Sequence, residues 1–129
     1  KEDLIHSSCT FERAFSHFQQ LTTIKDKKNR PYLSNIDIER FLLSNFSFHE
    51  KVTIHNQQPI LIEIAQRHLN QLFYDFYYKF DFTDSNDKKE VYFNLLKRTF
   101  QSQYKGAKFD IWKTNFARKY KNYPFNAVR

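Results

Sequence analysis

The chain contains a single glycine, Gly106, in 129 residues. Glycine supplies the positive φ angles that two-residue β-hairpin turns need, and it lets the backbone approach a phosphate closely. A Walker loop, a dinucleotide-binding fingerprint and a glycine-rich kinase loop each need several glycines, so the sequence excludes all three. The scarcity of glycine also disfavours folds built from tight hairpins. We therefore expect a mainly helical protein.

Apolar residues recur at intervals of three and four along most of the chain, as they do on one face of an α-helix. The longest such stretch runs to Phe80 behind Pro59, which stands where a first-turn proline is favoured. It predicts a long central helix over 59–80. The same spacing predicts further helices over residues 10–24, 34–46, 91–100 and 109–120.

Polar residues mark where several of these helices begin and end. Ser34 and Asp37 form a capping box for the second helix. Gly106 lies where a C-terminal cap is expected for the helix over 91–100. An acidic connector after Phe80 offers three residues as caps for the helix that follows it: Asp84, Ser85 and Asn86.

Residues 46–56 allow two interpretations. Ser47–Glu50 matches a capping box and predicts a short helix over 48–56, whereas the alternation of Val52 and Ile54 predicts a strand. In either case we expect a compact bundle of five or six helices around the central helix, with at most a minor strand near 46–56. The length fits one domain over residues 1–129.

Positive charge is concentrated in the last third of the chain. Residues 97–129 contain nine Lys or Arg and one acid, Asp110, which gives +8 against +7 for the whole chain. Aromatic residues such as Trp112 and Tyr120 lie between these cations. Cations bind phosphates by charge, and aromatic faces stack on bases. The segment therefore predicts a binding site for a polyanion, with nucleic acid or a nucleotide as its partner.

We assign the ligand site to this basic third and to the loop Lys25–Arg30. Trp112 is the best candidate for stacking on a base, although helical spacing also fits a place in the core. The loop is either a second phosphate contact or an ordinary surface turn. The cations assigned to the ligand are Lys105, Lys108, Lys113, Arg118 and Lys119, joined by Lys25, Lys27, Lys28 and Arg30 of the loop.

Nothing in the sequence argues for catalysis or for a cofactor. His6, Cys9 and His17 lack the second pair of ligands that a structural zinc site needs. Cys9 has no local signature of a catalytic thiol, and as a single cysteine it excludes an internal disulfide. No pair of carboxylates stands out for acid–base chemistry. We therefore predict a binding protein rather than an enzyme.

Two segments carry a resemblance to a known family. The aromatic stretch 72–80, the acidic connector and the stretch 92–104 resemble the soluble domain of phage abortive-infection proteins. Thr10-Phe11-Glu12 is similar to an upstream helix of that family. The chain departs from the family pattern at Asn70-Gln71 and at Thr99-Phe100. A similar layout occurs in membrane-anchored effectors of type III CRISPR systems, whose cytosolic domain binds a cyclic oligoadenylate as an oligomer.

The resemblance implies an antiviral sensor at the cytoplasmic face of the inner membrane. It implies that transmembrane helices precede this fragment, which has no Met, and that the ligand is a cyclic oligoadenylate. Twenty-four aromatic residues, more than one small core is expected to hide, also predict a homo-oligomer. The alternative is a helical DNA- or RNA-binding module, and a third class is a basic domain for an acidic partner or an anionic membrane surface.

Overall fold

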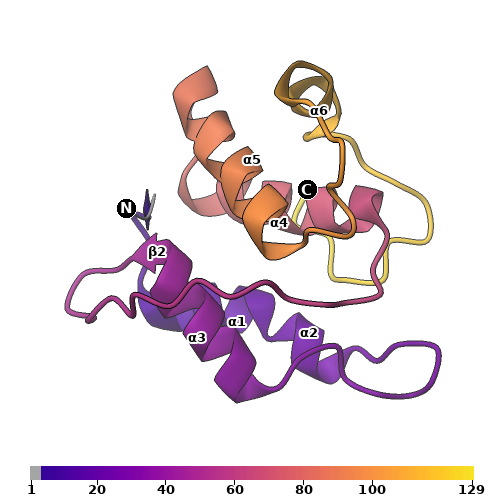
Figure 1. The fold of residues 1–129 in the computed structure, drawn as a ribbon, viewed down its shortest axis with the longest axis horizontal. Coiled ribbons are helices and arrows are strands. Elements are labelled where there is room, and N and C mark those ends of the chain that lie inside the picture. The colour runs from indigo at the N-terminus through magenta and orange to yellow at the C-terminus, as the bar shows by residue number, and fades with distance from the viewer. Residues whose placement is uncertain (1–3) are drawn as a thin grey trace. The chain divides into compact units, whose positions relative to one another are not determined.

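The computed structural model describes residues 4–129 and is mainly helical, with a small two-stranded parallel sheet (Figure 1). The mainly helical fold that the sequence predicts is therefore confirmed. Where the sequence predicts one domain, the chain divides into two compact units, Lys1–Gln58 (unit 1) and Pro59–Arg129 (unit 2). Each unit has its own buried core.

Unit 1 is built around α3, which begins at the predicted capping box. The Ser34 hydroxyl accepts from the Asp37 N–H at 3.1 Å, and the Asp37 carboxylate accepts from the Ser34 N–H at 3.4 Å. The predicted helix over 10–24 is present but interrupted at Gln19. The elements of this unit, in chain order, are β1 (Ile5–His6), α1 (Phe11–Phe18), α2 (Gln20–Thr23), α3 (Asn35–Asn45) and β2 (Phe46–Ser47).

The segment after α3 is not helical, so the predicted short helix over 48–56 is wrong. Glu50 has φ 62°, a left-handed conformation that interrupts regular structure. Beyond it the irregular chain is held against the end of α3, where the Ile54 N–H donates to the Leu43 carbonyl at 3.0 Å. A minor strand near 46–56 is present as β2, which pairs in parallel with β1, but Val52 and Ile54, whose alternation predicted it, lie in neither helix nor strand.

Unit 2 contains α4 (Gln66–Phe80), α5 (Asn86–Thr99) and α6 (Phe109–Asn115). Ser85 caps α5 as predicted, its hydroxyl accepting from the Asp87 N–H at 3.1 Å. Gly106 has a φ of 75°, but it lies in the loop before α6 rather than at a helix end, because α5 already ends at Thr99. None of the helices within residues 4–129 is long and apolar enough to cross a membrane.

The central helix of this unit begins at Gln66, not at Pro59 as predicted. Side chains in the preceding stretch alternate between inside and outside. Ile62 and Ile64 are buried, whereas Leu61 is 86% exposed. Alternation with a period of two is typical of an extended chain. It could not be recognised in the sequence, because buried and exposed positions of this stretch are both mostly apolar.

Hydrogen bonds to the region after α5 hold this extended stretch in place. The Ile60 N–H donates to the Thr99 carbonyl at 2.7 Å, and the Gln103 side-chain amide donates to the Ile62 carbonyl. These partners lie about forty residues away in the sequence. They override the local helical preference, because tertiary context outweighs intrinsic propensity.

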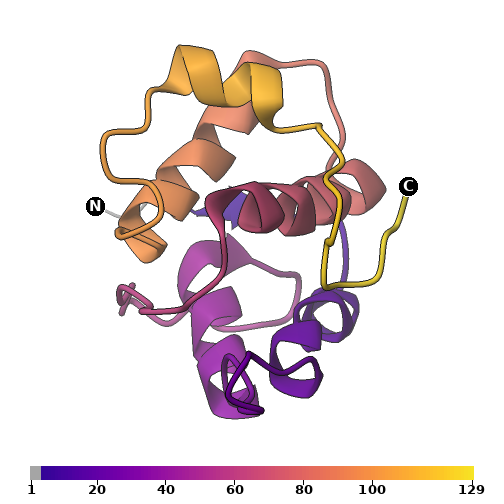
Figure 2. The same cartoon turned by 90° about the vertical axis from the view of Figure 1, so that its right-hand side faces the viewer.

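The last predicted helix is shorter than expected. It ends at Asn115 rather than at residue 120, and residues 116–129, called the tail below, form no helix or strand. Figures 1 and 2 show the tail in yellow, returning past α4. The tail therefore needs hydrogen-bond partners that no helix of its own supplies.

The two cores take up most of the aromatic residues. Phe18 is fully buried in unit 1, and Tyr77 and Phe116 are fully buried in unit 2. Of the 24 aromatic residues in the sequence, Tyr78 and Phe82 are the two classed as exposed, at 49% and 52%. An excess of aromatic residues therefore gives little support to self-association, which stays a prediction.

The capping box of α3 gives a stability prediction. Replacing Ser34 with Ala removes the acceptor for the Asp37 N–H and should lower the free energy of unfolding by about 1 kcal/mol. Urea unfolding followed by circular dichroism measures the loss. The matched control is Ser16→Ala, an exposed serine inside α1, which should be neutral or slightly stabilising. Equal losses in both variants would contradict the capping role.

Candidate functional site

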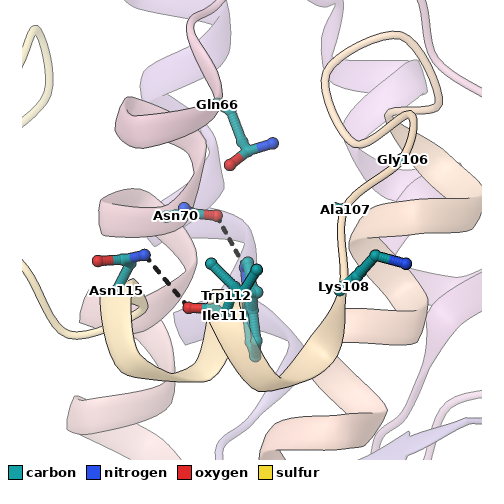
Figure 3. A pocket seen from close by; sticks show the side chains of 8 residues that line it. All are labelled: Gln66, Asn70, Gly106, Ala107, Lys108, Ile111, Trp112 and Asn115. Atoms are coloured by element: carbon teal, nitrogen blue, oxygen red, sulfur yellow. Dashed lines mark hydrogen bonds between the residues drawn. The ribbon is translucent and has the colours of Figure 1, made fainter.

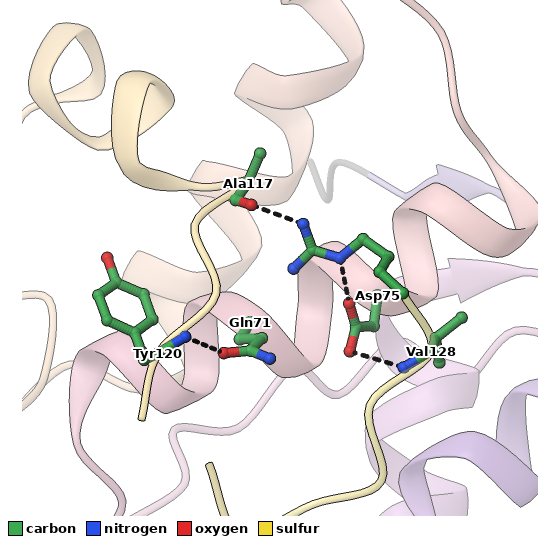
Figure 4. Close-up of polar contacts among 6 residues, drawn as sticks. Gln71, Asp75, Ala117, Tyr120 and Val128 are labelled. Atoms are coloured by element: carbon green, nitrogen blue, oxygen red, sulfur yellow. Dashed lines mark hydrogen bonds and ion pairs between the residues drawn. The ribbon is translucent and has the colours of Figure 1, made fainter. Parts of the chain in front are cut away.

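The buried face of α4 in unit 2 carries polar side chains that hold the tail. Gln71 accepts from the Tyr120 N–H at 2.8 Å, and Asp75 accepts from the Val128 N–H at 3.4 Å (Figure 4). His68 adds a contact of 3.4 Å between its Nε2 atom and the Lys121 carbonyl, and burial lowers the pKa of this imidazole. These side chains replace the backbone ladder that the tail lacks.

Arg129, in the basic third, makes an ion pair, a hydrogen bond and a cation–π contact within unit 2. Its Nε atom lies 2.7 Å from the Asp75 carboxylate, and its Nη1 atom donates to the Ala117 carbonyl at 2.5 Å (Figure 4). Its guanidinium lies 4.5 Å from the centre of the Tyr74 ring. Only 12% of the Arg129 side chain and 1% of the Asp75 side chain are exposed. Arg129 is thus a structural residue whose charge is neutralised.

Trp112 lies in the core, not on the surface. It is 3% exposed, and its ring stacks on Phe116 with 4.2 Å between centroids. Its indole N–H donates to the Asn70 side-chain oxygen at 3.0 Å. A residue covered in this way offers no open face to a base. Trp112 is therefore a core residue, and the predicted stacking role is wrong.

The cations assigned to phosphates differ in their surroundings. Lys113 pairs with Asp110 at 3.5 Å and lies 5.4 Å from the centre of the Phe109 ring. The other four are exposed, and within the described part of the chain no acidic side chain pairs with any of them: Lys105, Lys108, Arg118 and Lys119.

The loop Lys25–Arg30 belongs to unit 1 and is an ordered surface turn. The Asp26 carboxylate accepts from the Lys28 and Arg30 N–H groups, both at 2.9 Å, and pairs with the Arg30 guanidinium at 3.3 Å. These interactions, led by the Arg30 backbone hydrogen bond, lower the pKa of Asp26. Arg30 is therefore partly engaged, while Lys25, Lys27 and Lys28 are exposed.

Unit 2 contains a cavity of about 230 Å³, and one of the assigned cations, Lys108, is among the residues that line it (Figure 3). Lys108 lies at its edge, and its amino group points away from the labelled amide side chains. The cavity is lined by residues from the start of α4, from the loop before α6 and from α6 itself: Gln66, Asn70, Gly106, Ala107, Lys108, Ile111, Trp112 and Asn115. The site is therefore rich in neutral amides.

The amide residues of this cavity were not among the predicted site residues. The signal that could have found them is the placement of Asn70 and Gln71 side by side in the middle of an apolar helix. Buried polar side chains need partners, so such a pair indicates either a structural bond or a ligand. In this protein Gln71 holds the tail and Asn70 lines the cavity.

Metal-ligating side chains and the single cysteine form no alternative site in the described part of the chain. Among residues 4–129, no group of three or more His, Cys, Asp or Glu side chains gathers as a metal site would require. Cys9 is buried, and its neighbour Ser7 lies in hydrogen-bond contact with it at 3.2 Å. The cavity, with Lys108 at its edge, and the other exposed cations of residues 97–129 are therefore the best candidate.

No protein-family model matches the chain, and no curated protein or solved structure is significantly similar to it. The resemblance to the abortive-infection family stays a prediction.

The Asp75–Arg129 pair gives a second stability prediction. Replacing Asp75 with Asn leaves a nearly buried guanidinium without its counter-charge, which should cost about 3–5 kcal/mol of unfolding free energy. The double variant Asp75→Asn/Arg129→Met removes both charges and should lose less than Asp75→Asn alone. Urea unfolding measures each loss. A single variant as stable as the parent would show that the pair does not anchor the tail.

Proposed function

We propose that unit 2 binds a nucleotide-based polyanion through the exposed cations of its basic third. The observation that carries this proposal is that Lys105, Lys108, Arg118 and Lys119 are exposed and unpaired with any acid in the described structure. An ordinary surface mixes both signs of charge, whereas an excess of cations attracts polyanions.

The charge of each unit supports this choice of surface. Residues 59–129 contain thirteen Lys or Arg and seven Asp or Glu, a net charge of +6, whereas residues 1–58 carry +1. Two of the seven acids are already committed to cations, Asp75 to Arg129 and Asp110 to Lys113. The remaining cations of residues 97–129 therefore have few acidic side chains nearby in the sequence to balance their charge.

The ligand we propose first is a cyclic oligoadenylate second messenger, as the resemblance implies. The phosphates of such a ligand are arranged around a ring, and cations from several copies around a symmetry axis would meet them best. The proposal therefore includes a homo-oligomer. It also includes the place that the resemblance implies, a cytosolic sensor domain of a membrane-anchored antiviral effector.

The second candidate is a linear DNA or RNA strand. It is favoured by Arg118, Lys119 and Lys121, three exposed cations within four residues of the irregular tail, which could contact successive phosphates of a strand. The two candidates differ in their salt dependence, because a linear polyanion releases many counterions and binds with a steep log-salt slope. A messenger sensor should instead prefer one ring size and ignore duplex DNA.

Charge reversal tests the proposed surface. Lys105→Glu/Lys108→Glu and Arg118→Glu/Lys119→Glu should each weaken binding of fluorescent cyclic tetra-adenylate by about 100-fold or more, because a charge-assisted hydrogen bond contributes about 1.5–3 kcal/mol. Fluorescence anisotropy at several salt concentrations measures binding, with single-stranded RNA and duplex DNA as competitors. The matched control is Lys79→Glu/Lys89→Glu, which changes the charge equally outside residues 97–129.

The outcomes separate the candidates. A steep salt slope with equal binding of RNA and the cyclic ligand would favour the linear strand. If both reversal variants bind as tightly as the control, the exposed cations are a solvated surface and the proposal is wrong.

Self-association is tested by light scattering at tens of micromolar, with and without the cyclic ligand. We expect a defined oligomer at least in the presence of ligand. A strict monomer under both conditions would contradict the assembly around a symmetry axis.

A further inference from the structure

The side chain of Asn70 is held in one orientation by two buried donors. Its oxygen accepts from the Tyr104 hydroxyl at 2.5 Å and from the Trp112 indole N–H at 3.0 Å. An indole N–H can only donate, so it is the amide oxygen that must face Trp112. Burial raises the pKa of Tyr104 well above its ordinary value, so this phenol stays protonated and also donates.

In this orientation the Asn70 oxygen is occupied by two hydrogen bonds, whereas its NH₂ group donates to no residue of the described structure. The residue is 3% exposed, it lines the cavity, and among the described residues no acceptor bonds its amide nitrogen (Figure 3). This nitrogen is not one of the fully enclosed polar atoms that lack a partner, so it is open to the cavity and can donate to a molecule there. The free NH₂ group therefore points to an occupant of the cavity that offers an acceptor.

Two other amides of the cavity are fixed the opposite way round. The Gln66 side-chain nitrogen donates to the Gln103 carbonyl at 2.7 Å, and the Asn115 side-chain nitrogen donates to the Ile111 carbonyl at 3.2 Å. Each amide donates one bond through its nitrogen, and no donor among the described residues bonds its oxygen, which stays available as an acceptor. The amides that line the cavity thus offer one free donor, on Asn70, and two free acceptor oxygens, on Gln66 and Asn115.

The matching ligand is a planar ring that carries an acceptor next to an amino donor. Adenine has this pattern, with a ring nitrogen beside its exocyclic amino group, and its usual protein partner is an amide NH₂ group together with an amide oxygen. Guanine and hypoxanthine carry a carbonyl in place of that amino group and would set an acceptor against the oxygens of Gln66 and Asn115. The apolar atoms of Ile111 and Trp112 complete the wall.

The volume of the cavity limits how large a part of a ligand it can enclose. Its volume of about 230 Å³ is below the roughly 300–1,000 Å³ of sites for drug-sized ligands, so it fits one base rather than a whole messenger. Lys105 and Lys108 stand on either side of the Gly106–Ala107 part of the wall. A phosphate attached to a base in the cavity would emerge near them.

We propose that this cavity binds an adenine ring of a nucleotide, with Asn70 donating to a ring nitrogen and Gln66 or Asn115 accepting from the amino group. The inference rests on the proposed function and deepens it, because it supplies the base recognition that Trp112 was predicted to give by stacking.

The single tryptophan makes the test direct. Its indole N–H gives one side-chain signal in a ¹H–¹⁵N spectrum, and that N–H bonds Asn70 inside the cavity wall. Titration with adenosine 5′-monophosphate should shift this signal saturably. Inosine and guanosine 5′-monophosphate, which have the same charge, should bind at least about tenfold more weakly.

Three variants locate the base. Asn70→Asp keeps an oxygen for Tyr104 and Trp112 but turns the free donor into an acceptor, and should weaken adenosine 5′-monophosphate binding about tenfold or more. Gln66→Ala/Asn115→Ala removes both acceptors at more accessible positions, so it remains informative if Asn70→Asp does not fold. The control is Asn94→Ala, an exposed amide on α5 outside the cavity.

The outcomes distinguish this inference from the proposed function. If adenosine 5′-monophosphate and its inosine analogue bind equally, or the cavity variants bind like the control, the base lies elsewhere and the inference fails. The proposed function still stands in that case if Lys105→Glu/Lys108→Glu weakens cyclic tetra-adenylate. If no nucleotide and no cyclic ligand binds the parent protein, both fail.

Discussion

The organisation of unit 2 depends on the polar side chains that α4 buries. A segment without helix or strand can be packed against a core only if its backbone donors and acceptors find partners. Gln71 and Asp75 provide acceptors for the tail, and Asp75 also neutralises Arg129. Because the tail is held in this way, Phe116 and Phe125 can be buried. The polar face of one helix thus organises an irregular segment of fourteen residues.

The same helix links the structural and the ligand-binding roles proposed for unit 2. Asn70 lies one residue before Gln71 and faces Tyr104 and Trp112 instead of the tail. These bonds join the loop before α6, and α6 itself, to α4, and two of the bonded residues, Asn70 and Trp112, line the cavity. Asn70 is therefore held in one orientation because it is also part of the core, as expected for a preorganised site.

The sequence predicted the parts of the fold that depend on local interactions. Helix periodicity and the Ser34–Asp37 capping box located α3 correctly, since both act within one or two turns. The sequence-based prediction was wrong at 59–65, where hydrogen bonds to the distant residues Thr99 and Gln103 hold the chain in an extended conformation. Charge counting found the basic third but could not tell that Arg129 is neutralised. The cavity was missed because amides carry no charge and no periodicity.

The link between Asp75 and Arg129 also bears on the order in which unit 2 forms. α4 and α5 are joined by a short connector, whereas the bonds of the tail close loops of 49 to 54 residues. Loop closure costs entropy before its contacts are gained, so local helix pairs precede distant docking. During synthesis the ribosome delivers α4 well before Arg129. In a nascent chain the Asp75 side chain is therefore exposed to water until residues 116–129 have been made and can pack against α4.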